Sequence, residues 1–321
     1  MWSLFRWLII LVWFGVSTEA WAANHYVREA ATGSADGSDW TNACTDFTGS
    51  CDDDLLVRGD TYYVATGTYN RTQTDDAHRW QPAVSGTQVI TVKGATAADH
   101  GAETGWVASY GVDVTQASFE FYNTGTFGMS LQTSYFVLDG VVGSGSNSSS
   151  YGFLCKPPPS ATTNQSPGCV FVGILSSTTT TTNVQVKHMA YVGTDATVND
   201  ITANAFQACG SPGYCDTITF ANNYSEKTVK FLQSSSMANS TVESNYIKNV
   251  GASFSAHAEY WSSNNCHSND GGNCAGHTTQ CTQNDCADNV TARYNFFGGL
   301  LGASLTGGIV ALDGNSRGLK N

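Results

Sequence analysis

Charged side chains are scarce in this sequence. Only 12% of the residues are Asp, Glu, Lys or Arg, and 14 Lys and Arg against 26 Asp and Glu leave a formal net charge of −12. So acidic a surface repels nucleic acid and anionic lipid, and neither is expected as a partner. It would also repel a polyanionic polysaccharide unless a local cation or metal ion compensated. The low charge, with 33 Gly residues and abundant Ser, Thr and Asn, favours turns and flat polar sheets over long surface helices.

Long apolar runs are absent after the N-terminus. The first 22 residues hold one early cation, Arg6, an apolar run from Trp7 to Val16, and the ending Ala20-Trp21-Ala22. An apolar core of about ten residues is too short to span a bilayer, and the A-x-A ending fits a signal peptidase. The alternative is an N-terminal membrane anchor. We expect residues 1–22 to be a signal peptide and residues 23–321 to form one exported, soluble domain, extracellular or periplasmic.

The ten cysteines contain no C-x2-C pair, a spacing typical of zinc sites. An even number of cysteines in an exported chain indicates disulfides, here local bridges that staple loops. The clusters are Cys44 with Cys51, Cys155 with Cys169, Cys209 with Cys215, and Cys266, Cys274, Cys281 and Cys286 together. Zinc is the alternative for residues 266–286, which also contain His267 and His277.

A short phrase recurs in the second half of the chain. TITFANNY, STVESNY and NVTARYNFF each place alternating apolar residues before an Asn that an aromatic residue follows. Asn223 and Asn245 are 22 residues apart and Asn295 follows after 50, which leaves an extra loop of about 28 residues. A period in the twenties predicts a right-handed parallel β-helix, a solenoid of stacked coils. Residues 143–183 lack this period and are expected to form a loop that projects from the coils.

The period also predicts contacts, because equivalent residues of stacked coils lie about 4.8 Å apart. The three asparagines should form a ladder of hydrogen-bonded side chains along the axis. The same register places Glu226 beside Lys248 and Glu243 beside Arg293. These oppositely charged pairs are expected to be structural.

A short helix is expected near the start of the mature chain. Asp39 is a candidate N-cap for a helix over Asp39–Phe47, with Trp40, Ala43 and Phe47 on one face. Such a helix would cover the open end of a β-helix and protect its strand edges.

The region after this helix resembles a known family. Gly59-Asp60 makes a turn, Thr61–Ala65 alternates as a strand, and Gly67-Thr68-Tyr69 leads into the next strand. This order resembles the first coil of the pectate-lyase-like right-handed β-helix proteins. The likeness continues through Ser85–Trp106 and Ser134–Gly143. The chain is similar to an uncharacterised bacterial group of exported β-helix proteins. The resemblance implies an all-β fold but no particular substrate, because this fold hosts lyases, hydrolases, epimerases and adhesins.

Two stretches resemble functional motifs but have simpler explanations. The RGD at Arg58–Asp60 is accounted for by the Gly-Asp turn rather than by cell adhesion. Asp52-Asp53-Asp54 lacks the spaced D-x-D-x-D-G pattern of a calcium loop, so a solvated loop or cap is expected there.

One constellation is left as a candidate site. His257 and Glu259 are two residues apart and would share one face of a strand. Tyr260 and Trp261 follow directly, and the loop of residues 266–286 begins five residues later. A histidine, a carboxylate, aromatic rings and a covering loop are the ingredients of a sugar cleft. The resembling group often has a His/Glu pair at this point; the alternative is a hydrogen-bonded structural pair.

Two hypotheses about function follow. By resemblance, the chain is a polysaccharide lyase that cleaves a uronate-containing glycan by β-elimination. His257 would be the base, Lys230 or Ca²⁺ would neutralise the substrate carboxylate, and Glu259 would orient His257 or bind metal. No protein metal site is assigned beyond this, and no pair of carboxylates suggests a hydrolase. The second hypothesis is a non-enzymatic adhesin or rod that binds a polysaccharide or cell-surface glycan.

The sequence closes with a strand and a turn, TGGIVALDGNSRGLKN, and no polar or helical cap. A bare last coil would be an open edge. We therefore expect that the chain is a C-terminally truncated fragment, or that a partner or self-association caps it.

Overall fold

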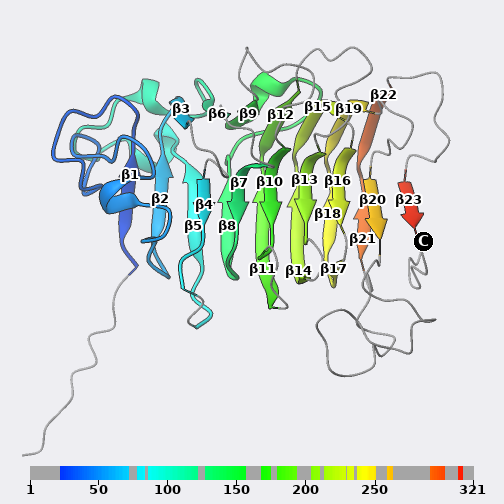
Figure 1. The fold of residues 1–321 in the computed structure, drawn as a ribbon. Helices are drawn as coiled ribbons and strands as arrows, with labels where there is room; N and C mark the ends of the chain where they lie inside the picture. Colours follow the sequence, from blue (N-terminus) through cyan, green and yellow to red (C-terminus); the bar gives the residue numbers. More distant parts are fainter. Residues whose placement is uncertain are drawn as a thin grey trace, which may run out of the picture.

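Strands in three parallel sheets dominate the computed structural model (Figure 1). The structure describes residues 22–71, 78–83, 86–121, 127–156, 168–174, 179–193, 204–209, 213–228, 230–234, 237–250, 259–262, 290–300 and 310–313. Within these residues the only α-helix is α1 (Ala97–His100), accompanied by short 3-10 turns. None of the helices in this part of the chain is long and apolar enough to cross a membrane.

Each sheet is built from strands that are far apart in the sequence. Sheet A contains, in order, β1 (Asn24–Val27), β2 (Thr61–Val64), β5 (Ile90–Gly94), β8 (Phe136–Asp139), β11 (Thr180–Lys187), β14 (Tyr214–Ala221), β18 (Thr241–Glu243) and β21 (Thr291–Arg293), and β17 (Met237–Ala238) also pairs with β14. Sheet B contains β3 (Gly67–Arg71), β6 (Ala117–Phe121), β9 (Phe153–Lys156), β12 (Met189–Val192), β15 (Tyr224–Thr228), β19 (Tyr246–Val250) and β22 (Phe296–Leu300). Sheet C contains β4 (His78–Trp80), β7 (Phe127–Leu131), β10 (Gly168–Val172), β13 (Asn204–Ala208), β16 (Lys230–Ser234), β20 (Glu259–Ser262) and β23 (Val310–Asp313).

From β2 onward the chain visits sheets A, B and C in turn, and we call one such passage a coil. Every strand pair is parallel, because each coil runs in the same direction as the one before (Figure 1). The arrangement is compatible with a parallel β-helix. The predicted period is confirmed in the register, since Tyr224 pairs with Tyr246 and Tyr246 pairs with Phe296.

The predicted asparagine ladder is confirmed at the corner between sheets A and B. The residue before each ladder Asn has a left-handed backbone, with φ of 53° at Asn222, 57° at Ser244 and 57° at Tyr294. The next residue turns the chain into sheet B, and its side chain bonds the neighbouring coil. Nδ2 of Asn245 donates to Oδ1 of Asn295 over 2.9 Å.

The predicted charge pairs are also confirmed. Nζ of Lys248 lies 3.3 Å from Oε1 of Glu226, and Nε of Arg293 lies 2.6 Å from Oε2 of Glu243. Each pair joins two neighbouring strands, so these cations hold adjacent coils together.

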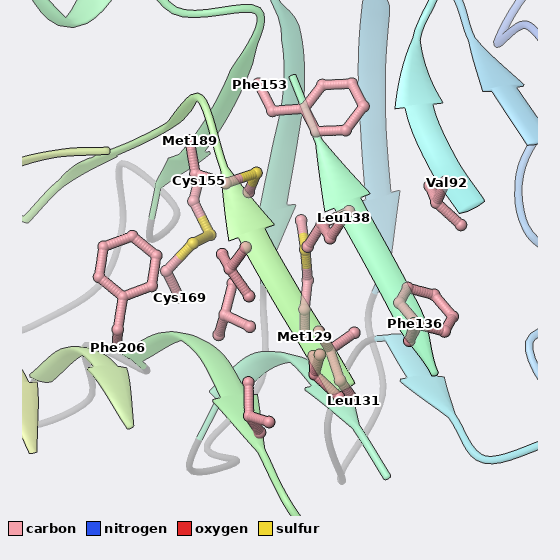
Figure 2. Packing of buried hydrophobic residues seen from close by; sticks show 14 of the residues in the cluster. Val92, Met129, Leu131, Phe136, Leu138, Phe153, Cys155, Cys169, Met189 and Phe206 are labelled. Atoms are coloured by element: carbon pink, nitrogen blue, oxygen red, sulfur yellow. A yellow bond between two sulfur atoms is a disulfide. The ribbon is translucent and has the colours of Figure 1, made fainter. Parts of the chain in front are cut away.

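The core lies between the three sheets and contains a disulfide (Figure 2). Cys155 of β9 and Cys169 of β10 are bonded to each other and both are 0% exposed. The expectation of a projecting loop over residues 143–183 is therefore wrong, because β9, β10 and part of β11 lie in this range. Two short buried strands in a Ser/Thr-rich stretch are too brief to show a period.

The other described cysteines also pair as predicted, Cys44 with Cys51 and Cys209 with Cys215. The cluster at residues 266–286 lies outside the described residues.

The predicted N-terminal helix does not form. The Asp39 carboxylate accepts hydrogen bonds from the backbone amides of Thr41 and Asn42, both over 2.8 Å, as an N-cap would. The chain then leaves the helical path because Cys44 makes a parallel bridge to Val27 of β1. The three apolar residues predicted for the helix face are buried all the same. The segment contacts β1 as an irregular loop instead of a helix.

Candidate functional site

Four of the five predicted site residues lie on neighbouring strands of sheet C. Lys230 begins β16, and β20 begins with Glu259, Tyr260 and Trp261. The two strands are hydrogen-bonded in parallel, with Leu232 opposite Glu259. The fifth residue, His257, lies outside the described residues.

The register of sheet C separates the β20 residues into two sets. Tyr260 continues a column that holds Phe171, Gln207 and Gln233 in successive strands. Glu259 continues the neighbouring column, which passes through Leu232. Leu232 is part of the buried core and Gln233 is half-buried. Tyr260 therefore shares its register column with two half-buried glutamines and the buried Phe171, whereas Glu259 shares its column with the core residue Leu232.

Lys230 is held by side-chain amides at the start of β16. Its Nζ donates to Oε1 of Gln233 over 3.1 Å, and the same oxygen accepts from Nδ2 of Asn204 over 2.9 Å. Asn204 pairs with Lys230 in the register of β13 and β16. Burial lowers the pKa of Lys230, because a partly desolvated ammonium group loses water that had stabilised its charge.

A second cluster, which the sequence did not predict, lies at the carboxyl ends of β8 and β11 in sheet A. Nδ1 of His188 is 2.7 Å from Oδ1 of Asp139, and Nζ of Lys187 is 3.0 Å from Oδ2. Burial alone would raise the pKa of Asp139, but hydrogen bonds from His188, the Val141 amide and Lys187 lower it to about 2. A carboxylate on Nδ1 fixes the histidine tautomer and leaves Nε2 as the second ring position. This geometry also joins two coils, since Asp139 pairs with Lys187 in the sheet.

The missed cluster had a signal in the sequence. The segments SYFVLDG and NVQVKHM can be aligned as equivalent strands of two coils. The structure pairs them in this register, with Phe136 opposite Val184. The alignment would have placed Lys187 beside Asp139, as the period placed Lys248 beside Glu226. The ladder position of this earlier coil is occupied by Met189 instead of an asparagine, and the step between the paired strands differs from 22 residues.

The other described histidines have carboxylate partners too. His78 and His100 are buried, with Nδ1 of His78 3.4 Å from Asp53 and Nδ1 of His100 2.7 Å from Glu103. Asp53 thus pairs with a buried ring. Within the described ranges, no group of three or more His, Cys, Asp or Glu side chains is placed to hold a metal ion.

Arg58 and Asp60 of the RGD sequence both make hydrogen bonds within the fold. The Arg58 guanidinium donates to four acceptors: the carbonyl oxygens of Ala83, Gln88 and Ser134, and Oγ1 of Thr133. Asp60 is buried and accepts hydrogen bonds at both oxygens. These contacts give the motif a structural explanation, as its turn predicted.

Comparison with known proteins finds no matching family model, no matching curated protein and no matching solved structure.

Proposed function

We propose that the protein is an exported right-handed parallel β-helix protein of the pectate-lyase-like kind, and that it cleaves a uronate-containing polysaccharide by β-elimination at sheet C. The observation that carries this proposal is the adjacency of β16 and β20, which brings Lys230 next to the strand of Glu259, Tyr260 and Trp261. The cyclic visits to three parallel sheets support the fold assignment.

Each residue has a chemical role in this proposal. Elimination requires a base for the proton at C5 and a cation for the C6 carboxylate, which becomes more electron-rich as the proton leaves. His257 is the proposed base and Glu259 its orienting group or a metal ligand. The Lys230 ammonium, supported by Gln233, is proposed to bind the carboxylate. Tyr260, which continues the register column of Gln233, would stack on a sugar ring. Trp261 lies opposite the buried Ser234 in the alternate column, so the second aromatic role predicted from the sequence is not part of the proposal. Ca²⁺ would be a second source of positive charge.

The test is an absorbance assay at about 235 nm, where unsaturated uronates absorb, on a panel of polyuronates with and without Ca²⁺. We expect a signal that His257→Ala abolishes and Lys230→Met weakens mainly through KM. Lys248→Met is the matched control, because it removes the same charge from an ion-paired lysine of sheet B. A well-folded protein that is silent on the whole panel would reject the lyase proposal.

A second candidate is a non-enzymatic rod that binds glycans. Cross-strand ion pairs on sheets A and B favour it, because Lys156, Lys187 and Lys248 each face a carboxylate. Such pairs stabilise a rod but reduce its attraction for a polyanion. A glycan array combined with the absorbance assay separates the candidates. Binding on the array that is unchanged in Lys230→Met, together with no cleavage in the absorbance assay, supports the rod.

A further inference from the structure

The first residues of β1 converge on the buried carboxylate of Asp60. The backbone nitrogen of Ala23 is 2.9 Å from Oδ1, and Nε2 of His25 is 2.9 Å from Oδ2. The His25 ring stacks on Tyr62 with centroids 4.6 Å apart. The carbonyl of Ala23 accepts from the Thr61 amide over 2.9 Å. The backbone nitrogen and the carbonyl oxygen of Ala23 are thus both hydrogen-bonded, and the nitrogen is directed at one carboxylate oxygen of Asp60.

Ala23 is also the residue that follows the A-x-A ending at Ala22, where the sequence predicts signal-peptide cleavage. We propose that Asp60 is a built-in receptor for the mature N-terminus, and that removal of the leader turns the Ala23 nitrogen into an ammonium group that forms an ion pair with Asp60. This proposal rests on export, one part of the proposed function, and is independent of any glycan chemistry.

The covalent step is hydrolysis by a signal peptidase. Water adds across the peptide bond between Ala22 and Ala23: the C–N bond breaks, a C–O bond forms, and the leader leaves with a terminal carboxylate. The released amine takes up a proton at neutral pH. A hydrogen bond between a neutral amide and a carboxylate thereby becomes charge-assisted, which is shorter and roughly twice as strong.

Asp60 is suited to receive a cation, because it is held in place and largely removed from water. It is 7% exposed, and it follows Gly59, whose φ of 93° demands a glycine. The turn is anchored by the hydrogen bond from the Gly59 amide to the Val89 carbonyl over 3.2 Å. A buried carboxylate without a cation is costly, so a positive partner is worth more here than on the surface.

The new amine would be mostly protonated at neutral pH, because the ordinary pKa of an α-amino group is about 8. His25 is positive only when protonated. Burial raises the pKa of Tyr62 to about 12, so this ring stays neutral, and its hydroxyl accepts from the Val57 amide. Before cleavage Nε2 of His25 and the neutral Ala23 amide contact the Asp60 carboxylate, and cleavage replaces the amide by an ammonium group.

The first experiment is N-terminal sequencing of the exported protein, which we expect to begin at Ala23. The second compares urea unfolding of protein that begins at Ala23 with the same protein after N-terminal acetylation, which removes the charge and keeps the nitrogen. We expect acetylation to lower the folding equilibrium constant about tenfold, the equivalent of one pKa unit. The same loss is expected in the Asp139→Asn background, whose carboxylate lies in another coil, and no loss in the Asp60→Asn background.

Titration of the Ala23 amine by NMR keeps the test decisive if Asp60→Asn fails to fold. In the folded mature protein we expect the pKa of this amine to lie above its value in the unfolded chain, because the carboxylate favours the charged form. A mature chain that begins elsewhere, an acetylation without effect, or an amine pKa equal to that of the unfolded chain would each overturn the proposal.

Discussion

Asn223 and Asn245 are 22 residues apart in the chain and are hydrogen-bonded to each other across two coils. The backbone nitrogen of Asn223 donates to Oδ1 of Asn245 over 2.8 Å. Nδ2 of Asn245 donates in turn to the carbonyl of Phe220 over 3.1 Å. Both asparagines are buried, so each side chain satisfies backbone groups that the sheets leave unpaired at the corner.

The ladder predicts a large effect for Asn245→Ala. The substitution removes the acceptor of the Asn223 amide and the donor to Phe220, and it leaves both backbone groups buried without these partners. We expect the free energy of unfolding to fall by about 3 kcal/mol, measured by urea denaturation. Asn147→Ala, at an exposed turn, is the control and should cost about 0.5 kcal/mol. A loss below about 1 kcal/mol at Asn245 would contradict the role of the ladder.

The ladder also explains which parts of the fold could be predicted from the sequence. In three successive coils the corner between sheets A and B is bridged by a side-chain amide, so Asn223, Asn245 and Asn295 recur at equivalent positions and reveal the register. The register then places Glu226 beside Lys248 without further information. The predictions that succeeded depended on this repeated chemical requirement.

Other features depend on contacts between segments that share no pattern. The Asp39–Phe47 stretch has a cap residue and an apolar face, yet the bridge from Cys44 to Val27 and the disulfide to Cys51 decide its path. Burial of a sulfur or a phenyl ring can be achieved by a loop as well as by a helix. The disulfide of Cys155 is a second example. Its short sequence separation predicted a bridge within a surface loop, although the bond lies inside the core.

The candidate site was predictable only as far as its strands. The spacing of His257 and Glu259 suggested one face, and the structure assigns Glu259 to β20 beside Leu232. The support of Lys230 by Gln233 and Asn204 joins two strands of sheet C, whereas the recurring asparagines mark the corner between sheets A and B, so the period did not predict it.

Asp139 should make stability depend on acid pH. Its pKa is about 2 in the folded protein and 3.8 as an ordinary carboxyl, so the contribution is complete above about pH 4 and is lost as the pH falls through 2. The unfolded state binds the proton first, which is why acid favours unfolding. The side chain is 17% exposed, and we expect a contribution of about 2 kcal/mol.

The measurement is the difference in unfolding free energy between the wild type and Asp139→Asn, in urea at pH 5 and at pH 2.5. The difference should narrow at the lower pH. A difference that stays the same at both pH values would show that the His188 and Lys187 contacts do not stabilise the ionised form.

Arg58 should be sensitive even to lysine. Its guanidinium joins the carbonyl of Ala83 to Ser134 and Thr133, which precede β8. A lysine has one ammonium centre and cannot reach acceptors on several sides at once. We expect Arg58→Ala to cost about 2 kcal/mol in urea unfolding, and Arg58→Lys to recover less than half of the loss. Full recovery by lysine would mean that charge alone matters at this position.

The core disulfide should resist reduction until the protein unfolds. Cys155 and Cys169 are 0% exposed, so a soluble thiol cannot approach either sulfur in the folded chain. Labelling with a thiol reagent after incubation in dithiothreitol should find no modification of this pair without urea, and full modification with urea. Rapid labelling in native buffer would instead place these sulfurs at the surface, as the projecting-loop interpretation of residues 143–183 requires.

Removal of this disulfide should also destabilise the fold. The separation of 14 residues implies that the double variant Cys155→Ala/Cys169→Ala lowers the free energy of unfolding by about 3 kcal/mol through loop entropy, plus the cost of the cavity left beside Met189.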